Sequence, residues 1–98
     1  MRFEWDEQKN RRNLAKHRVS FETAWLVFDD PFSLSILGHV AGEEERWQTL
    51  GLVAGTVVLL VAHTYRESEG HEVIRIISAR KATPRERKVY EENREAAG

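Results

Sequence analysis

The sequence contains no cysteine, which excludes disulfide scaffolds, thiolate zinc sites and cysteine nucleophiles. It also lacks a long apolar run: the longest, residues 57–62, is far shorter than a membrane-spanning helix requires. The first residues have no apolar segment of the kind found in secretory signals. From these absences we expect a soluble protein of the cytoplasm that has no membrane partner.

Length and composition limit the architecture. With 98 residues, the chain is long enough for one hydrophobic core and too short for separate catalytic and regulatory domains. Hydrophobic residues make up 41% of the chain, which is too high a share for an intrinsically disordered protein. Charged residues make up 32%, which is too high a share for a membrane protein. We therefore expect a single domain over residues 1–98 with one active surface.

The near-zero net charge conceals an uneven distribution. The formal total is −1, yet residues 9–18 carry five positive charges and no acid. Residues 80–88 carry five positive charges and one acid, so the two basic segments sum to +9 and the rest of the chain to −10. These segments form one surface for a polyanion only if the fold brings them together. Otherwise each is an ordinary solvated face.

Two helices are predicted near the N-terminus. Asp6 suits the N-cap of a helix that runs to about His17 and that has few apolar residues, so most of its surface is exposed. Ser20 is a second N-cap candidate, followed by apolar residues at the helical spacing i, i+3, i+4, i+7. We expect this second helix to pack inward and to end before Pro31, because proline disfavours helical geometry in the preceding residue.

From residue 32 the pattern is typical of strands. The predicted strands are residues 32–36, 46–53, 56–65 and 71–79. Residues 38–44 and 66–70 are predicted to be loops, whereas Ala54-Gly55 suits a tight hairpin turn. Because three of the connections are short, we expect a four-stranded antiparallel meander.

Residues 83–86 predict the start of the last helix. Thr83 at the N-cap, Pro84 at the first helical position and Glu86 at N3 form a capping box with the preferred first residue. This helix is expected from Pro84 to about Glu95. The resulting order, two helices, four strands and a helix, predicts an α+β domain with a sheet covered on one face.

Motifs from both halves of the chain form a recognisable pattern. The N-terminal half contributes Phe3-Glu4-Trp5-Asp6, Lys9, Asn10, Asn13, Lys16-His17, Val19, Phe21, Ala24 and residues 28–31. The second half contributes Glu45-Arg46, Gly51, residues 75–82, Glu86 and Tyr90. Over roughly residues 3–92, the chain resembles the BrnT family.

This resemblance implies a RelE-like fold and a toxin of a type II toxin–antitoxin system that cleaves RNA and arrests growth. The implied partner is a BrnA-type antitoxin with a ribbon-helix-helix DNA-binding region. Operator DNA would be contacted only through the antitoxin complex, which represses its own operon.

Arg18 departs from the family pattern, which usually has glycine after the Lys-His pair. Glycine suits the left-handed conformation at a helix end, and an arginine there costs about 1 kcal/mol. Either the helix ends differently in this chain, or the additional charge compensates for the strain.

Metal-free RNA cleavage needs cations around the phosphate, a base for the 2′-hydroxyl and an acid for the leaving oxygen. Arg80 and Lys81 lie where the last strand meets the capped helix, and we expect Arg80 to clamp a phosphate and Lys81 to add a second charge. The alternative is a solubilising strand end. The histidines outside the basic segments lack metal-ligand spacing, so no metal or other cofactor is expected: His39, His63 and His71.

Two adjacent pairs are candidates for acid–base chemistry. Glu45 and Arg46 are either a catalytic acid or base with its charge partner, or a surface ion pair of little energetic value. In Lys16-His17, neighbouring positive charge favours the neutral, base-competent imidazole. The alternative is a histidine at a helix terminus where the dipole favours its charge.

Tyr90 and three further basic residues complete the candidate site. Tyr90 lies four residues after Glu86 on the same helix face, where it either contacts RNA or anchors the helix in the core. Lys9, Arg12 and Arg85 are interpreted as non-specific phosphate contacts that would make RNA binding depend on salt.

Three functions stay open from the sequence. The first is a metal-independent endoribonuclease toxin that an antitoxin neutralises. The second is a non-catalytic module that binds nucleic acid or acts as corepressor in the same complex. The third is a structural subunit whose basic face meets the acidic tail of a partner.

Overall fold

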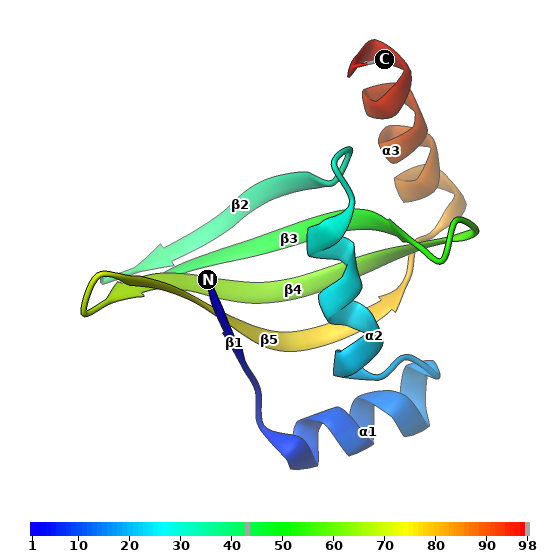
Figure 1. The fold of residues 1–98 in the computed structure, drawn as a ribbon. Coiled ribbons are helices and arrows are strands. Elements are labelled where there is room, and N and C mark those ends of the chain that lie inside the picture. Colours follow the sequence, from blue (N-terminus) through cyan, green and yellow to red (C-terminus); the bar gives the residue numbers. More distant parts are fainter. Residues whose placement is uncertain (43, 98) are drawn as a thin grey trace.

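The structure, a computed structural model, describes residues 1–42 and 44–97. Within these residues the chain forms one five-stranded sheet, three α-helices and a short 3₁₀ helix, η1 (Figure 1). The elements are β1 (Arg2–Glu4), α1 (Glu7–His17), α2 (Phe21–Trp25), η1 (Leu26–Asp29), β2 (Leu34–Ala41), β3 (Glu44–Val53), β4 (Val57–Ser68), β5 (His71–Lys81) and α3 (Pro84–Ala97). The predicted α+β class is confirmed.

The helices begin at the predicted caps. The Asp6 carboxylate accepts from backbone N–H groups at the start of α1, and the Ser20 hydroxyl accepts from the N–H of Thr23. At α3, Thr83 and Glu86 bond reciprocally as a capping box.

None of the helices of the described residues is long and apolar enough to cross a membrane.

The sheet has five strands, whereas four were predicted. Its order is β1-β5-β4-β3-β2, with β1 parallel to β5 and the other pairs antiparallel. The additional strand, β1, is three residues long and pairs Phe3 with Ile74. The alternation of Phe3-Glu4-Trp5 is too short to predict a strand by itself, and this segment becomes one by pairing with the edge of β5.

The prediction of a loop over residues 38–44 was wrong. Strand β2 continues to Ala41, and Gly38 lies in a bulge between two runs of paired residues. A glycine inside a strand favours such a bulge, because the ladder is interrupted there without ending. Of the predicted loop, Glu43 lies outside the described residues. The loop predicted over residues 66–70 is likewise shorter, because β4 reaches Ser68 before the turn.

The main core lies between the sheet and the N-terminal helices. It contains Val19, Phe21, Ala24, Val27, Val53, Leu59, Val61, Ile76 and Ala79. The segment η1 approaches β3 closely at Gly51, where an added Cβ would lie 2.6 Å from the Cβ of Val27. Only glycine permits this approach, which allows η1 to pack directly on β3.

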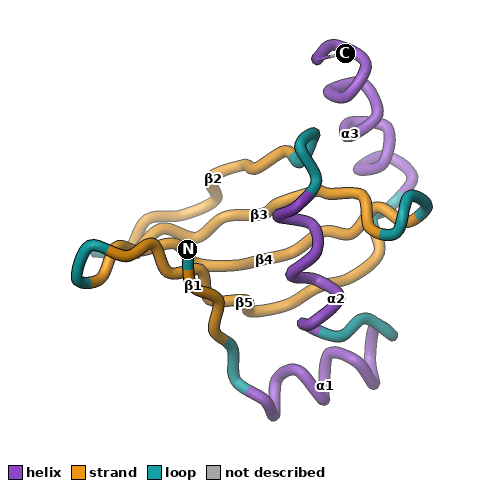
Figure 2. Tube along the Cα trace, in the orientation of Figure 1, coloured by secondary structure: helices purple, strands orange, loops and turns teal. Residues whose placement is uncertain are grey.

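A second, smaller core lies on the opposite face of the sheet. Tyr90 of α3 packs there against Leu50, Val58 and Leu60. The tube view shows α2 crossing one face while α3 projects from one end of the sheet (Figure 2). Helices therefore contact both faces, which corrects the prediction of cover on one face only. Because α3 contacts only one end of the sheet, it does not cover the rest of the sheet face on which it lies.

Candidate functional site

The face that α3 contacts carries polar side chains in register across four strands. His39, Arg46, Thr64 and Arg75 are successive partners across β2, β3, β4 and β5. Two parallel rows follow: Ile36, Gln48, Ala62 and Ser78, then Leu34, Leu50, Leu60 and Arg80. Directly paired residues point to the same side of a sheet. Arg46, Arg75 and Arg80 therefore share one surface, which we call the open face and define by these three rows.

His39 reaches the open face because of the bulge at Gly38. In a regular strand, His39 would point to the same side as Leu37, but the shift in register pairs it with Arg46 instead. A hollow in this face is lined by Gly38, His39, Arg46, Trp47, Gln48, Ala62, His63 and Ile77. His39 was not predicted to belong to the site, because it lies outside the two basic segments and lacks metal-ligand spacing. The signal that identifies it is a glycine within an otherwise strand-like segment.

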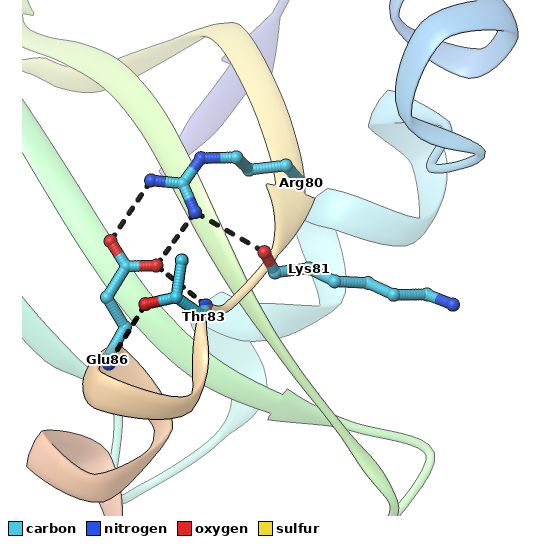
Figure 3. A network of polar contacts seen from close by, with 4 residues as sticks. All are labelled: Arg80, Lys81, Thr83 and Glu86. Atoms are coloured by element: carbon cyan, nitrogen blue, oxygen red, sulfur yellow. Dashed lines mark hydrogen bonds and ion pairs between the residues drawn. The ribbon is translucent and has the colours of Figure 1, made fainter.

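Arg80 is held by a carboxylate at the junction of β5 and α3 (Figure 3). Its two terminal nitrogens donate to the carboxylate oxygens of Glu86 at 2.7 and 3.0 Å. This hydrogen bonding lowers the pKa of Glu86 to about 2 and raises that of Arg80. The Arg80 side chain is still 37% exposed. It therefore fixes the strand-to-helix junction and remains accessible at one end of the open face.

Lys81 points away from Arg80, toward the other face (Figure 3). There it lines a pocket together with Arg18, which follows the last turn of α1. Arg18 from the first basic segment and Lys81 from the second line the same pocket, so the fold brings the two segments together here. Lys16 and His17 precede Arg18 in the last turn of α1, and we call Lys16, His17, Arg18 and Lys81 the second basic surface.

The predicted residues are consequently divided between two surfaces. α1 lies beside β5, through hydrogen bonds between Asn13 and Ala79. Arg46 lies on β3, two strands and therefore about 10 Å away from β5. The structure places Arg46 with Arg80 on the open face, whereas His17 lies in the last turn of α1, next to Arg18.

Arg18 adopts the conformation expected of the glycine that it replaces. Its φ of 61° is left-handed, and its N–H donates to the carbonyl oxygen of Leu14 at 2.9 Å. Helix α1 therefore ends in the way the family pattern implies, with an arginine in a position that favours glycine.

Glu45 and Arg46 do not form a pair. As neighbours in β3 they point to opposite faces of the sheet, and the Glu45 carboxylate accepts from the Trp47 indole N–H at 3.1 Å. Arg46 is the member of the pair that belongs to the open face. The pairing predicted from sequence was wrong because strand geometry separates adjacent side chains.

Tyr90 occupies the core rather than the surface. It is 1% exposed, and its hydroxyl donates to Asp30 at 2.5 Å. Burial and the Asp30 carboxylate raise the pKa of Tyr90 to about 12. Of the two roles that the sequence allows, the structure shows the anchoring one.

The remaining predicted residues are surface cations. Lys9 and Arg12 are exposed on α1, and Arg85 is exposed in the first turn of α3. Over residues 1–42 and 44–97, no group of three or more histidine, aspartate or glutamate side chains is arranged to hold a metal ion.

Comparison with known proteins adds a family match. The model of a family described as the ribonuclease toxin BrnT of type II toxin–antitoxin systems matches residues 5–86. This span contains Arg46, Arg75 and Arg80, and it ends before Tyr90. No curated protein matches the sequence.

Proposed function

This chain belongs to the BrnT family of ribonuclease toxins of type II toxin–antitoxin systems, and on that premise we propose that it cleaves RNA on the open face without a metal ion. The family membership implies an RNA target and an antitoxin partner. The observation that carries the proposal is the register that places Arg46, Arg75 and Arg80 on one accessible sheet surface. Guanidinium groups suit this task, because they bind phosphate oxygens with paired N–H donors.

The reaction that these residues support is attack of the RNA 2′-hydroxyl on the adjacent phosphorus. A base takes the 2′-hydroxyl proton as the 2′-oxygen forms its bond to phosphorus, and an acid protonates the 5′-oxygen as its bond to phosphorus breaks. The products are a 2′,3′-cyclic phosphate and a 5′-hydroxyl end. Arginines of the open face would stabilise the charge that develops on the phosphate.

His39 is the imidazole best placed for the proton transfer. It lies in the same row as Arg46 and lines the hollow of the open face. His17, the base candidate from sequence, belongs to the second basic surface at the edge of β5. A neutral imidazole accepts a proton near neutral pH, and the resulting imidazolium can return it to the leaving oxygen.

The second basic surface is proposed to hold the RNA chain on either side of the cleaved bond. Lys16, Arg18 and Lys81 provide its charge, and the exposed cations Lys9, Arg12 and Arg85 are proposed as further phosphate contacts. Such contacts bind phosphates irrespective of base sequence, so the affinity should fall steeply as the salt concentration rises.

The antitoxin is proposed to be of the BrnA type, with a ribbon-helix-helix region through which the complex contacts operator DNA. The family match supports an antitoxin in general. The resemblance of residues 3–92 to the BrnT pattern supports the BrnA type in particular. Repression of a reporter that carries the operator should therefore require both proteins, and the toxin alone should leave the reporter active.

Cleavage of single-stranded RNA by the purified full-length protein in EDTA tests the activity. We expect products with cyclic phosphate ends, and Arg46→Gln should lower the rate by about 100-fold. The matched control is Arg87→Gln, an exposed arginine of α3 outside both surfaces. His39→Ala and His17→Ala separate the two base candidates.

Intact RNA after incubation with folded wild-type protein would contradict the proposal. If that protein still bound RNA and still repressed its operon with the antitoxin, the non-catalytic binding module would be the correct function. RNA cleavage that stops in EDTA and returns with added magnesium would contradict the metal-independent mechanism alone.

A further inference from the structure

The hydroxyl of Thr64 is buried and has no hydrogen-bond partner among the described residues. Thr64 is 2% exposed, and its carbonyl oxygen lies 3.3 Å from Nδ1 of His63, which can donate to it. A buried donor without an acceptor normally destabilises a fold, and this hydroxyl keeps the capacity to donate to a ligand.

Two arginines flank this hydroxyl. Arg46 and Arg75 are the direct cross-strand partners of Thr64, one on each side. Neighbouring strands are about 4.8 Å apart, so the two arginine Cα atoms lie about 10 Å apart with Thr64 midway between them. Both side chains are exposed and long enough to converge over Thr64.

The nearby acids leave this group of three residues with net positive charge. Glu4, the register partner of Arg75, makes its ion pair with Arg66 at 3.1 Å. Glu44 lies two residues before Arg46 and lines a different pocket, which it shares with Arg66. Among the described residues, neither Arg46 nor Arg75 forms a salt bridge.

We propose that Arg46, Thr64 and Arg75 form the site for one phosphodiester group of RNA, with the Thr64 hydroxyl as a donor to a phosphate oxygen. The inference rests on the proposed function and adds to it the Thr64 hydroxyl as a phosphate ligand and a shared site for Arg46 and Arg75 around it. The flexible arginine side chains move to admit the anion, and the anion supplies the acceptor that Thr64 lacks. Two guanidiniums and a neutral hydroxyl then surround the phosphate.

A ligand that cannot be cleaved allows phosphate binding at this site to be measured separately from RNA cleavage. The probe is a single-stranded 2′-O-methyl RNA oligonucleotide, which keeps the phosphates but lacks the nucleophile. Its affinity for the full-length protein is measured over a series of salt concentrations. Arg75→Gln should weaken binding about tenfold and reduce the salt slope by about one, because one charged contact is lost.

Thr64→Val gives the sharper test, because it should weaken binding without lowering stability. Removal of an unpaired buried hydroxyl should leave the melting temperature unchanged or raise it. Binding of the oligonucleotide should weaken about threefold to tenfold with an unchanged salt slope, because a neutral donor is lost. Arg87→Gln and Thr56→Val are controls of the same residue types outside this site, and both should bind as the wild type does.

Two results would overturn the inference. If Thr64→Val raised stability and bound the oligonucleotide as the wild type does, the hydroxyl would be an unused buried group. If Arg75→Gln and Arg87→Gln weakened binding equally, Arg75 would contribute only general charge. Either result could accompany normal RNA cleavage by the wild type, so the proposed function would stand. A wild-type protein that neither cleaves RNA nor binds the probe would instead overturn both.

Discussion

The side-chain amide of Asn13 takes the place of a neighbouring strand for Ala79. Its Nδ2 donates to the Ala79 carbonyl oxygen at 2.7 Å, and its Oδ1 accepts from the Ala79 N–H at 3.1 Å. The same Nδ2 donates to the carbonyl oxygen of Val19 at 2.8 Å. One buried side chain thereby satisfies two backbone groups on the part of β5 that β1 does not pair and one in the link between α1 and α2, and it joins α1 to the sheet.

Asn13→Ala should lower the free energy of unfolding by about 2–4 kcal/mol, because buried backbone groups lose their partners. Urea denaturation of the full-length protein measures this change. Arg11→Ala, an exposed change in the same helix, is the control and should stay within about 0.5 kcal/mol of the wild type. A loss below about 1 kcal/mol for Asn13→Ala would mean that water replaces the amide.

Tyr90→Phe tests whether Tyr90 anchors α3 or takes part in cleavage. The variant keeps the ring in the core and removes the hydroxyl that donates to Asp30. We expect a loss of about 2 kcal/mol in stability, as for a hydrogen bond to a charged group, and RNA cleavage at the wild-type rate well below the melting temperature. Thermal unfolding and the cleavage assay are compared on the same preparation. A lower rate with unchanged stability would contradict the anchoring role.

The Arg80–Glu86 contact should make stability depend on pH in the acidic range. Hydrogen bonding from Arg80 holds the pKa of Glu86 at about 2, below the ordinary value near 4.5. The unfolded chain therefore binds this proton first as the pH falls. The stabilisation is present above about pH 4.5 and disappears as the pH falls toward about 2.

Glu86→Gln should remove this contribution and lower stability at pH 7 by about 1 kcal/mol, a modest figure because solvent screens the partly exposed pair. The wild type and the variant should become closer in stability as the pH falls from 5 to 3. Glu91→Gln, an exposed change in the same helix, controls for the loss of one carboxylate. Parallel pH profiles for the wild type and Glu86→Gln would show that the ion pair contributes nothing to stability.

Arg18→Gly should stabilise the protein and weaken RNA binding. Glycine relieves the left-handed strain at φ 61°, a gain of about 1 kcal/mol, while the second basic surface loses a charge. Arg18→Ala is the matched control, because it removes the same charge and retains the strain. Both variants should show the same reduced salt slope in oligonucleotide binding. Equal melting temperatures for the two would contradict the conformational argument.

Local signals in the sequence were sufficient for the ends of most elements. Asp6, Ser20 and Thr83 cap the three helices because capping depends on residues within one turn. Ala54-Gly55 forms the predicted turn, with φ values of 54° and 71°. By contrast, β1 and the second half of β2 were missed, because three residues are too few to predict a strand and a glycine was interpreted as a loop signal.

The candidate site was only partly accessible from the sequence. Arg46 and Arg80 were predicted, and the structure places them on one face. His39 and Thr64 were not predicted to belong to the site, since neither lies in a basic segment and their position depends on pairing with β3. Glu45 was paired with Arg46 because the two are adjacent in sequence, although adjacent strand residues point to opposite faces.

Composition, capping residues and strand alternation determined the α+β class, the helix starts and the presence of two basic segments, because each depends on residues close together in the chain. Strand register decided which charges share a surface, because a shift of one residue moves a side chain to the other face. The bulge at Gly38 brings His39 beside Arg46, and the end of β5 separates Arg80 from Lys81. These outcomes depend on hydrogen bonds between distant segments, and so only the tertiary structure could decide them.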